Sequence, residues 1–298
     1  MRKQTKAYAY ASLAVVAWAT AASAFKLTLR HVDFLQLLCG ASLVSIVALF
    51  VVLLIQGKLG LLRQNSQGDY LRSLVLGLLN PFIYYIVLLK AYSVLPAQEA
   101  MVLNYTWPIM LVLLSIPLLK QKIGLVSVLA IFVSFGGVVV IATRGDVSNL
   151  SFSNPVGAGL ALGSAVIWGV FWIGNVRDDR DEVAKLFLSF CFGFPFVLAA
   201  TAFFSELRLP DLPGLAGMVY VGLFEMGITF VFWLMALRHS RTTARVSNLI
   251  HLIPFLSLVV IHIAVGEKIL ASTVTGVVLV VGGIALQRYE RSSEPKDD

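Results

Sequence analysis

The sequence predicts an all-α polytopic membrane protein with ten transmembrane helices, arranged as an inverted five-plus-five helix repeat around a central cavity. Three observations predict this fold class: the composition, the distribution of basic residues and a set of landmarks shared by the two halves. Of the 298 residues, 58% are apolar and 13% are charged, and the mean hydropathy is +0.87. A soluble domain carries about 25% charged residues. The composition therefore indicates a chain that folds in lipid.

Ten apolar segments approach the roughly 20 residues that a helix needs to cross a hydrocarbon core about 30 Å thick. Their connections are too short to form a soluble domain. The basic N-terminus and the apolar run after it resemble a signal peptide, but no convincing cleavage site follows, so we expect a retained first helix. The predicted helices are residues 7–26, 33–55, 71–92, 97–118, 124–143, 156–175, 184–205, 214–237, 243–265 and 271–287.

The basic residues predict the orientation of these helices. With a cytoplasmic N-terminus, 17 of the 23 Lys and Arg residues fall on the cytoplasmic side and six on the other side. Basic residues are enriched in cytoplasmic loops. We therefore expect both termini in the cytoplasm of a bacterium, with the chain in its inner membrane. Because no basic residues form a compact surface, we expect no nucleic-acid partner despite the net charge of +7.

The two halves of the chain carry the same landmarks at the same spacings. In each half, 13 residues separate a proline from a Gln or Glu that precedes a lysine, and 15 more lead to a Gly-Gly pair. We therefore predict two repeats, residues 1–145 and 150–290, and a cytoplasmic tail at 291–298. An odd number of helices per repeat makes the second copy inverted, which is typical of secondary transporters. The alternative is a duplicated structural bundle. The landmarks are Trp18 and Trp168, Pro108 and Pro254, Gln121 and Glu267, Gly136–Gly137 and Gly282–Gly283.

The duplicated unit, with its mid-helix proline, later Gly-Glu and closing Gly-Gly, resembles the EamA-type members of the drug/metabolite transporter superfamily over about residues 7–290. The hexapeptide Leu-Asn-Tyr-Thr-Trp-Pro at 103–108, with Glu99 five residues before Asn104, resembles the fourth helix of a bacterial aromatic amino acid exporter of that superfamily. The resemblance implies a basket of ten helices, a cavity formed mainly by helices 1, 3, 4, 6, 8 and 9, and export of small metabolites. Gln121 departs from the family pattern, where Glu is common.

Polar groups within the predicted helices are candidate site residues, because each costs several kcal/mol in lipid unless it is paired or faces a wet cavity. Glu225, near the middle of the eighth helix, can stay protonated, pair with a cation or bind a substrate ammonium group. A protonated Glu bonded to a neighbouring helix is the alternative. Asn104 and Trp107 share one face of the fourth helix, where an amide suits a zwitterion and an indole suits an aromatic side chain.

Asn80 and Tyr84 lie one turn apart on the third helix and share a face. His251 titrates near neutrality when unperturbed, so it suits either proton coupling or a hydrogen bond between helices. Proline removes a backbone hydrogen bond and permits a bend, so we expect Pro81, Pro108 and Pro254 to be hinges.

Trp18 and Trp168 lie in mid-helix rather than at the interfaces where Trp is enriched, which indicates cavity lining or tight packing. Trp233 lies nearer the cytoplasmic end of its helix and is expected to be an interfacial anchor. The predicted substrate-binding residues are Trp18, Asn80, Tyr84, Glu99, Asn104, Trp107, Trp168, Trp172, Glu225 and His251.

The leading hypothesis is a secondary transporter that exports amino acids, aromatic ones and other neutral ones, by alternating access. Drug-like cations or other small metabolites are the alternative substrates. The chain has no glycine-rich nucleotide-binding motif. An intramembrane enzyme is disfavoured because the four histidines lack metal-ligand spacing and the charged run at 177–182 is typical of a solvated turn with internal charge pairing. A channel is the third class. We expect no catalytic residues, no cofactor and no metal. The expected partners are amino acids as substrates and the lipid bilayer. The small residues of helices five and ten suit either scaffold contacts or contacts in a homodimer.

Overall fold

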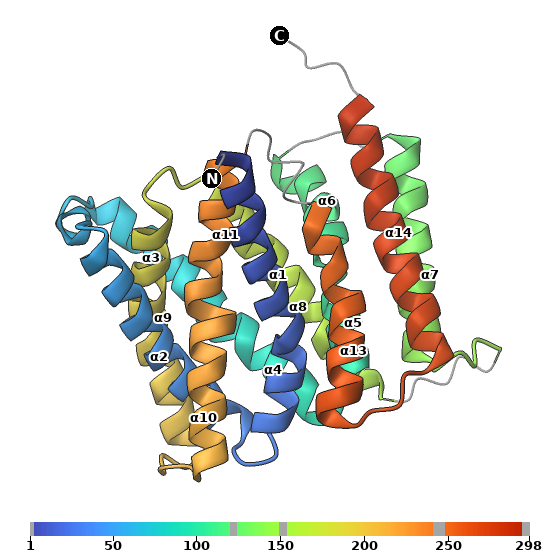
Figure 1. Cartoon of the computed structure of the whole chain (residues 1–298), viewed down its shortest axis with the longest axis horizontal. Helices are drawn as coiled ribbons and strands as arrows, with labels where there is room; N and C mark the ends of the chain where they lie inside the picture. Colours follow the sequence, from blue (N-terminus) through green and yellow to red (C-terminus); the bar gives the residue numbers. More distant parts are fainter. Residues whose placement is uncertain (1–2, 120–123, 149–153, 241–247, 294–298) are drawn as a thin grey trace.

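The computed structural model describes residues 3–119, 124–148, 154–240 and 248–293, and all the regular secondary structure described is helical (Figure 1). The elements are α1 Lys3–Thr28, α2 Phe34–Ile55, η1 Leu59–Arg63, α3 Gln67–Gly77, η2 Leu78–Ile83, α4 Tyr84–Val94, α5 Ala97–Asn104, α6 Trp107–Leu119, α7 Leu125–Ala142, α8 Pro155–Val176, α9 Glu182–Phe204, α10 Leu212–Val221, η3 Gly222–Gly227, α11 Ile228–His239, η4 Asn248–Leu252, α13 Ile253–Val265 and α14 Ala271–Ser293.

Seven helical stretches of the described chain are long and apolar enough to cross a membrane, and they coincide with the predicted helices one to four and six to eight. Three shorter apolar helices, Val128–Ala142, Leu249–Val265 and Ala271–Leu286, fall on the fifth, ninth and tenth. The all-helical, polytopic class is thus confirmed, while the count of ten spans and the repeat boundaries stay predictions. Residues 241–247, where the ninth predicted helix begins, and Gln121 lie outside the described residues.

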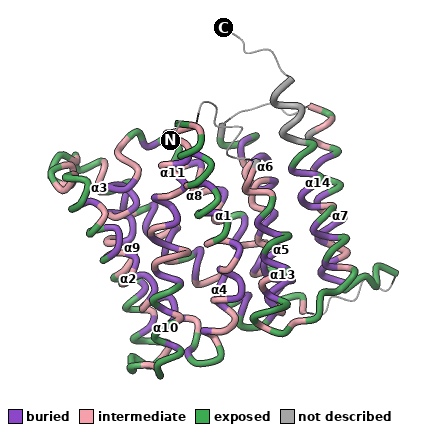
Figure 2. The backbone as a smooth tube through the Cα atoms, viewed as in Figure 1, coloured by how far each residue is buried: buried purple, intermediate pink, exposed green. Residues whose placement is uncertain are grey.

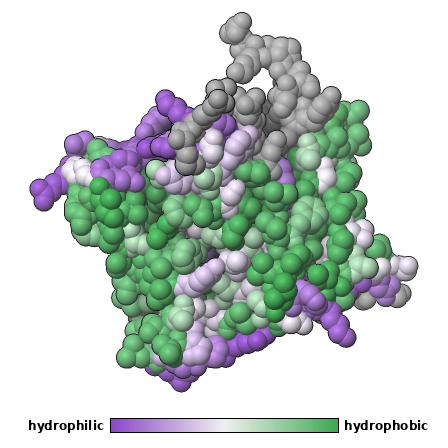
Figure 3. All heavy atoms as spheres, in the orientation of Figure 1, coloured by the Kyte–Doolittle hydropathy of each residue, from purple (hydrophilic) through white to green (hydrophobic). Residues whose placement is uncertain are grey.

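The surface and interior match a protein surrounded by lipid. Buried positions follow the inward sides of the helices (Figure 2), and the visible face carries a broad apolar band between two hydrophilic ends (Figure 3). Exposed large apolar side chains include Leu43, Val47 and Leu54 on α2. Because lipid does not penalise exposed apolar groups, these positions need no protein partner.

Two long predicted helices are broken near the middle. The stretch Gln67–Val94 contains η2, where Asn80 has the non-helical dihedral angles φ −145° and ψ 116°. The stretch Leu212–His239 contains η3, whose last residue, Gly227, has φ −113° and ψ −96°. Each stretch has 28 residues, so the two breaks lie at similar depths. The fourth predicted helix is also divided, into α5 and α6.

The three predicted hinge prolines all lie at or next to these interruptions. Pro81 lies within η2, Pro108 is the second residue of α6, and Pro254 is the second residue of α13, directly after η4. Proline is tolerated in the first turn of a helix, where the missing N–H has no intrahelical acceptor. The prolines therefore begin new helical segments.

The broad packing pattern is the same in the two halves of the chain. α1 packs on the α10–η3–α11 stretch and on α13, just as α8 packs on α4 and on α5 and α6. α9 packs on α3 and η2, just as α2 packs on α10 and η3. α2 also packs on α9, and α7 on α14. If each predicted helix is replaced by its counterpart in the other half, five helices further along the chain or five helices back, every one of these contacting pairs becomes a pair that is also in contact.

The α7–α14 pair is held close by glycines. A Cβ atom on Gly137 would lie 2.8 Å from the carbonyl oxygen of Gly276, and one on Gly283 would lie 2.6 Å from that of Ala130. A Cβ atom on Gly136 or Gly282 would meet nothing within 4 Å. In each Gly-Gly landmark, only the second glycine is therefore required for close helix contact.

The two ends of the bundle carry different charges. We call the end that holds the start of α1, residues 56–66, residues 177–181 and the end of α11 the basic end. The opposite end holds residues 29–33, 95–96, 143–148, 205–211 and 266–270. This grouping follows from contacts such as Lys58 Nζ donating to Asp181 Oδ2 at 2.6 Å at one end and His31 Nδ1 lying 2.8 Å from Asp211 Oδ2 at the other.

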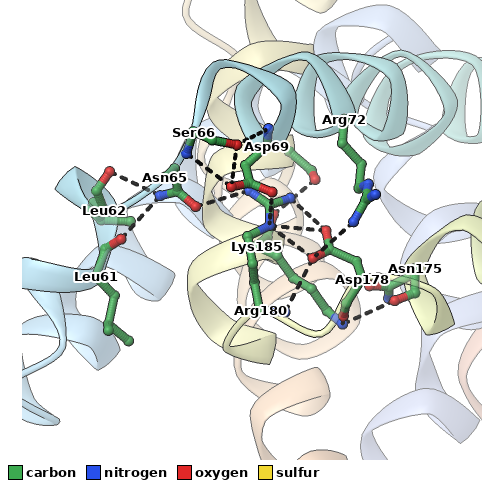
Figure 4. A network of polar contacts seen from close by, with 11 residues as sticks. Leu61, Leu62, Asn65, Ser66, Asp69, Arg72, Asn175, Asp178, Arg180 and Lys185 are labelled. Carbon is green, nitrogen blue, oxygen red and sulfur yellow. Dashed lines mark hydrogen bonds and ion pairs between the residues drawn. The ribbon is translucent and has the colours of Figure 1, made fainter.

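At the basic end, a buried carboxylate joins the two halves (Figure 4). The Asp178 side chain is fully buried and accepts from Arg180 Nε at 2.9 Å, while Arg180 Nη1 donates to Asn65 Oδ1 at 3.2 Å. Burial alone raises the pKa of Asp178, but the hydrogen bonds and charge of Arg180 outweigh burial and hold that pKa below its ordinary value. The internal charge pairing expected of this turn is thus present, but Asp178 is buried instead of solvated.

We expect Gly283→Ala and Gly137→Ala to destabilise the protein by about 1–3 kcal/mol, because the added methyl group collides with backbone. Gly282→Ala and Gly136→Ala are the matched controls, and we expect them to be neutral or slightly stabilising, since alanine favours helix. Thermal unfolding of the purified protein in detergent measures the difference. Equal effects at both members of a pair would contradict the helix contact.

We expect Asp178→Asn to destabilise the protein by about 1.5–3 kcal/mol, the usual contribution of hydrogen bonds to charged groups. Its exposed neighbour Asp179→Asn is the control. Because folding lowers the pKa of Asp178, its contribution is complete near neutrality and is lost as the pH falls below about 4. Thermal unfolding of the two variants between pH 7 and pH 3 tests this, since the gap between them should narrow in acid.

Candidate functional site

A cavity lies where the predicted helices 1, 3, 4, 6, 8 and 9 meet, the six helices that the resemblance implied. Its walls come from α1, α4, α5, α6, α8, η3, α11, η4 and α13. Seven of the ten predicted substrate-binding residues line it: Trp18, Tyr84, Asn104, Trp107, Trp168, Trp172 and Glu225.

Aromatic rings form a continuous wall of this cavity. The ring of Trp168 lies 4.7 Å from that of Tyr84, 6.1 Å from that of Trp172 and 6.0 Å from that of Phe230, measured between centroids. Trp18 lies 5.5 Å from Phe230, nearly edge-on. Such a wall offers flat apolar faces to a planar ligand and negative π faces to a cation.

Trp233 also belongs to this wall, which corrects its expected position at the interface. It is 5% exposed, lines the cavity, and its ring lies 5.8 Å from that of Trp18. The helix continues to His239 and packs against α1, so this face of α11 turns inward. The sequence indicates that the indole lies near the end of its helix, but its surroundings depend on the face of the helix that it occupies.

Glu225 supplies the carboxyl group of the cavity. It lies in η3, and Tyr85 donates its hydroxyl proton to Glu225 Oε1 at 3.2 Å. Among the described lining residues, Glu225 is the one carboxylate, and none is Lys, Arg or His. The carboxylate keeps further acceptor capacity for a ligand. A ligand that carries a positive charge therefore finds its complement at this point of the wall.

The other polar groups of the wall are mostly engaged with the protein. Asn104 Nδ2 donates to Ser164 Oγ at 2.9 Å, and the Tyr105 hydroxyl donates to the carbonyl oxygen of Ile250 at 2.6 Å. These two bonds tie α5 to α8 and to η4 across the cavity. Ser257 is different, because its buried hydroxyl has no hydrogen-bond partner among the described residues and it lines the cavity.

Asn80, Glu99 and His251 lie away from the cavity wall. Asn80 is fully buried within η2, which packs against α9. Glu99 is 2% exposed and accepts from Arg144 Nε at 2.7 Å, so it braces α5 against the turn after α7. His251 follows Ile250, which lines the cavity, but lies in a tight 3-10 turn that points neighbouring side chains in different directions.

Tyr85, Ser257 and Phe230 contribute to the site but were not predicted. Tyr85 follows Tyr84, and successive residues of a regular helix do not share a face. Both tyrosines lie at the break after η2, and their rings are 4.7 Å apart. Serine and phenylalanine in an apolar helix carry no individual signal. Among the described residues, no group of three or more His, Cys, Asp or Glu is placed to hold a metal ion.

An apolar outer surface and a cavity among broken helices are features of membrane transporters. A sequence profile of the EamA-like transporter family matches residues 5–143 and again residues 155–288. The chain belongs to this family, which consists of transporters and not enzymes.

Several relatives are similar over much of the chain. An uncharacterized transporter of Archaeoglobus fulgidus is 26% identical over 92% of this chain and 95% of its own length. A probable terminal-alkyne amino-acid exporter of Streptantibioticus cattleyicolor is 26% identical over 95% and 94%. The match to an uncharacterized transporter of Clostridium kluyveri, 26% identical, spans 60% of this chain and only 59% of that protein. A crystal structure with 21% identity aligns with a TM-score of 0.67 over 99% of this chain and 100% of its own, which supports the fold alone.

Proposed function

We propose that the chain is a secondary transporter that exports small amphipathic metabolites, aromatic amino acids first among them, across the bacterial inner membrane by alternating access. The observation that carries this proposal is the aromatic cavity with one carboxylate among helices that are broken in mid-membrane. Discontinuous helices at a midplane site are typical of secondary transporters. The name of the Streptantibioticus relative, a probable amino-acid exporter, agrees with the substrate class.

The proposed architecture is ten spans in two inverted repeats, residues 1–145 and 150–290. The matched pairings of α1 and α8, and of α2 and α9, support it, as does the double match of the family profile. The excess of Lys and Arg at the basic end supports a cytoplasmic location for both termini. The hinges would be the interruptions at Pro81, Pro108 and Pro254.

In the proposed binding mode, the substrate ammonium group pairs with Glu225, and its aromatic side chain packs against Trp168 and Tyr84. Carboxylate and ammonium together form a charge-assisted hydrogen bond, and stacked rings add about 0.5–1.5 kcal/mol to the burial of apolar area.

A specific observation favours a second class, lipophilic cations such as aromatic amines. The described wall holds one carboxyl group and no Lys, Arg or His. The carboxylate of an amino acid would therefore have only neutral donors, such as the Ser257 hydroxyl. Burying a carboxylate that is not matched by a positive charge is costly. An aromatic amine has no carboxylate, and its ammonium group is attracted to the faces of the aromatic wall.

We expect purified protein in liposomes to exchange labelled tryptophan or phenylalanine. Competition by the free amino acid, its methyl ester and the corresponding amine tests what the cavity recognises, because the ester removes the carboxylate charge while adding little volume. Competition by the amino acid alone would support amino-acid export, and stronger competition by ester and amine would support the cation class. If none competes and no amino acid exchanges, the substrate proposal fails.

We expect Glu225→Gln to weaken binding of every ammonium ligand by about tenfold or more, because it removes a charge-assisted hydrogen bond. Trp168→Ala should weaken binding of aromatic ligands most, and Asn104→Ala should loosen the α5–α8 contact. Glu206→Gln, at an exposed position at the opposite end, is the matched control. Wild-type exchange in all three cavity variants would refute the location of the site.

A further inference from the structure

The cavity is closed differently at its two ends. α1 contacts both α4 and α5, in addition to the pairings that the two halves share. The equivalent contacts would join α8 to α11 and α13, and within the described residues these helices do not approach each other to a comparable degree. Because α4 ends and α5 begins at the opposite end of the bundle, the extra contacts close that end.

Lys26, near the end of α1, holds the end of α4. Its Nζ atom donates to the carbonyl oxygen of Tyr92 at 2.9 Å and to that of Leu95 at 2.5 Å. These carbonyls belong to the last turn of α4 and its C-cap. Such groups lack intrahelical donors and form the negative end of the helix dipole. An ammonium group is therefore their natural complement.

Glu267, between α13 and α14, holds the start of α5. Its Oε1 atom accepts from the backbone N–H of Ala97 at 2.7 Å, and its Oε2 atom accepts from that of Gln98 at 3.2 Å. The Gln98 side chain in turn donates to the carbonyl oxygen of Lys268 at 2.9 Å. The first N–H groups of a helix lack intrahelical acceptors and form the positive end of its dipole. A carboxylate accepts hydrogen bonds from these N–H groups and is attracted to the positive end of the dipole.

These two residues reach across the mouth of the cavity from the same side. Arg30 Nη2 donates to the carbonyl oxygen of Val265 at 3.1 Å, which joins α1 to the end of α13. The turn at residues 94–98 lies on the other side. Just inside, the rings of Phe25 and Tyr92, which both line the cavity, meet edge-on at 5.1 Å between centroids.

We propose that Lys26 and Glu267 form a clasp on the turn at 94–98 that closes the outer end of the cavity, and that both must release it before a substrate can leave outward. Lys26 binds the carboxyl end of α4 and Glu267 binds the amino end of α5, so the two opposite charges make the clasp specific for the connection between these helices. The location of the clasp on the outer side rests on the proposed orientation, and its gating role rests on the proposed transport function. By spacing, the position that matches Glu267 in the first half is Gln121, which carries no charge.

The experiment measures access to the cavity from the outer side. Ala21→Cys, on the cavity wall one turn before Phe25, is introduced together with Cys39→Ser and Cys191→Ser. A membrane-impermeant maleimide is then added outside intact cells. Because each clasp residue makes two hydrogen bonds to backbone through a charged group, we expect Lys26→Met and Glu267→Ala each to speed labelling by about tenfold or more. Glu267→Gln keeps an acceptor oxygen and should fall between.

Two control variants separate the clasp from loss of charge alone. Lys268→Met removes a neighbouring charge whose exposed side chain takes no part in the clasp. Arg30→Gln breaks a bond on one side of the mouth only. We expect both to label at the parent rate. The proposal is overturned if Lys26→Met and Glu267→Ala, eluting as folded protein, label at the parent rate, or if the controls speed labelling equally.

Labelling requires no substrate, so the test is independent of the substrate proposal. Leu209→Cys, at a position 93% exposed between α9 and α10, reports the orientation. If it does not react from outside, the proposed orientation is wrong and the clasp faces the cytoplasm. If Leu209→Cys reacts and the clasp variants respond but no solute exchanges, the transport proposal fails while the clasp stands.

Discussion

The structure depends on the constraint that backbone polar groups cannot be left unsatisfied in lipid. Irregular backbone at membrane depth is tolerated only where protein covers it or where it borders a wet cavity. The breaks at η2 and η3 obey this rule, since α9 covers one and α2 covers the other. Glu225 lies within η3 and faces the cavity. The irregular segments and the polar site therefore occupy the same place for one physical reason.

Glycine makes that covering possible. Gly222 in η3 lies where a Cβ atom would be 2.5 Å from the carbonyl oxygen of Ala41, and Gly193 on α9 lies where one would be 2.5 Å from that of Gly77. Larger residues at these points would separate the helices and leave the freed backbone groups to lipid. The same close approach between α7 and α14 involves no break and no cavity, which indicates that this pair is a scaffold.

The sequence predicted the features that are costly to place in lipid, such as polar groups in apolar helices. It did not predict which way each helix is rotated about its axis. The helices followed from apolar length, and Glu225, Asn104 and Trp168 stood out as polar or aromatic groups at mid-depth. Trp233 was misplaced because depth along a helix says nothing of the face a side chain occupies. Glu99 looked like a candidate because its partner, Arg144, lies 45 residues away on another segment. The roles of Tyr85 and Ser257 could not be predicted from the sequence, because they depend on the break in the third helix and on the rotation of α13.

The ionisable groups of the described protein are distributed so that the cavity wall keeps a single carboxyl group and no basic side chain. At the ends, the buried carboxylates of Asp178 and Glu99 pair with Arg180 and Arg144. The half-buried Lys26 and Glu267 bind helix carbonyls and helix N–H groups. In the cavity, the hydroxyl of Tyr85 is a neutral partner and does not cancel the charge of an ionised Glu225. A ligand that brings a positive charge therefore gains more there than anywhere else in the described wall. In the proposed clasp, Lys26 and Glu267 close the outer end by binding helix termini. The closure does not use the Glu225 carboxylate, which therefore stays available to the ligand.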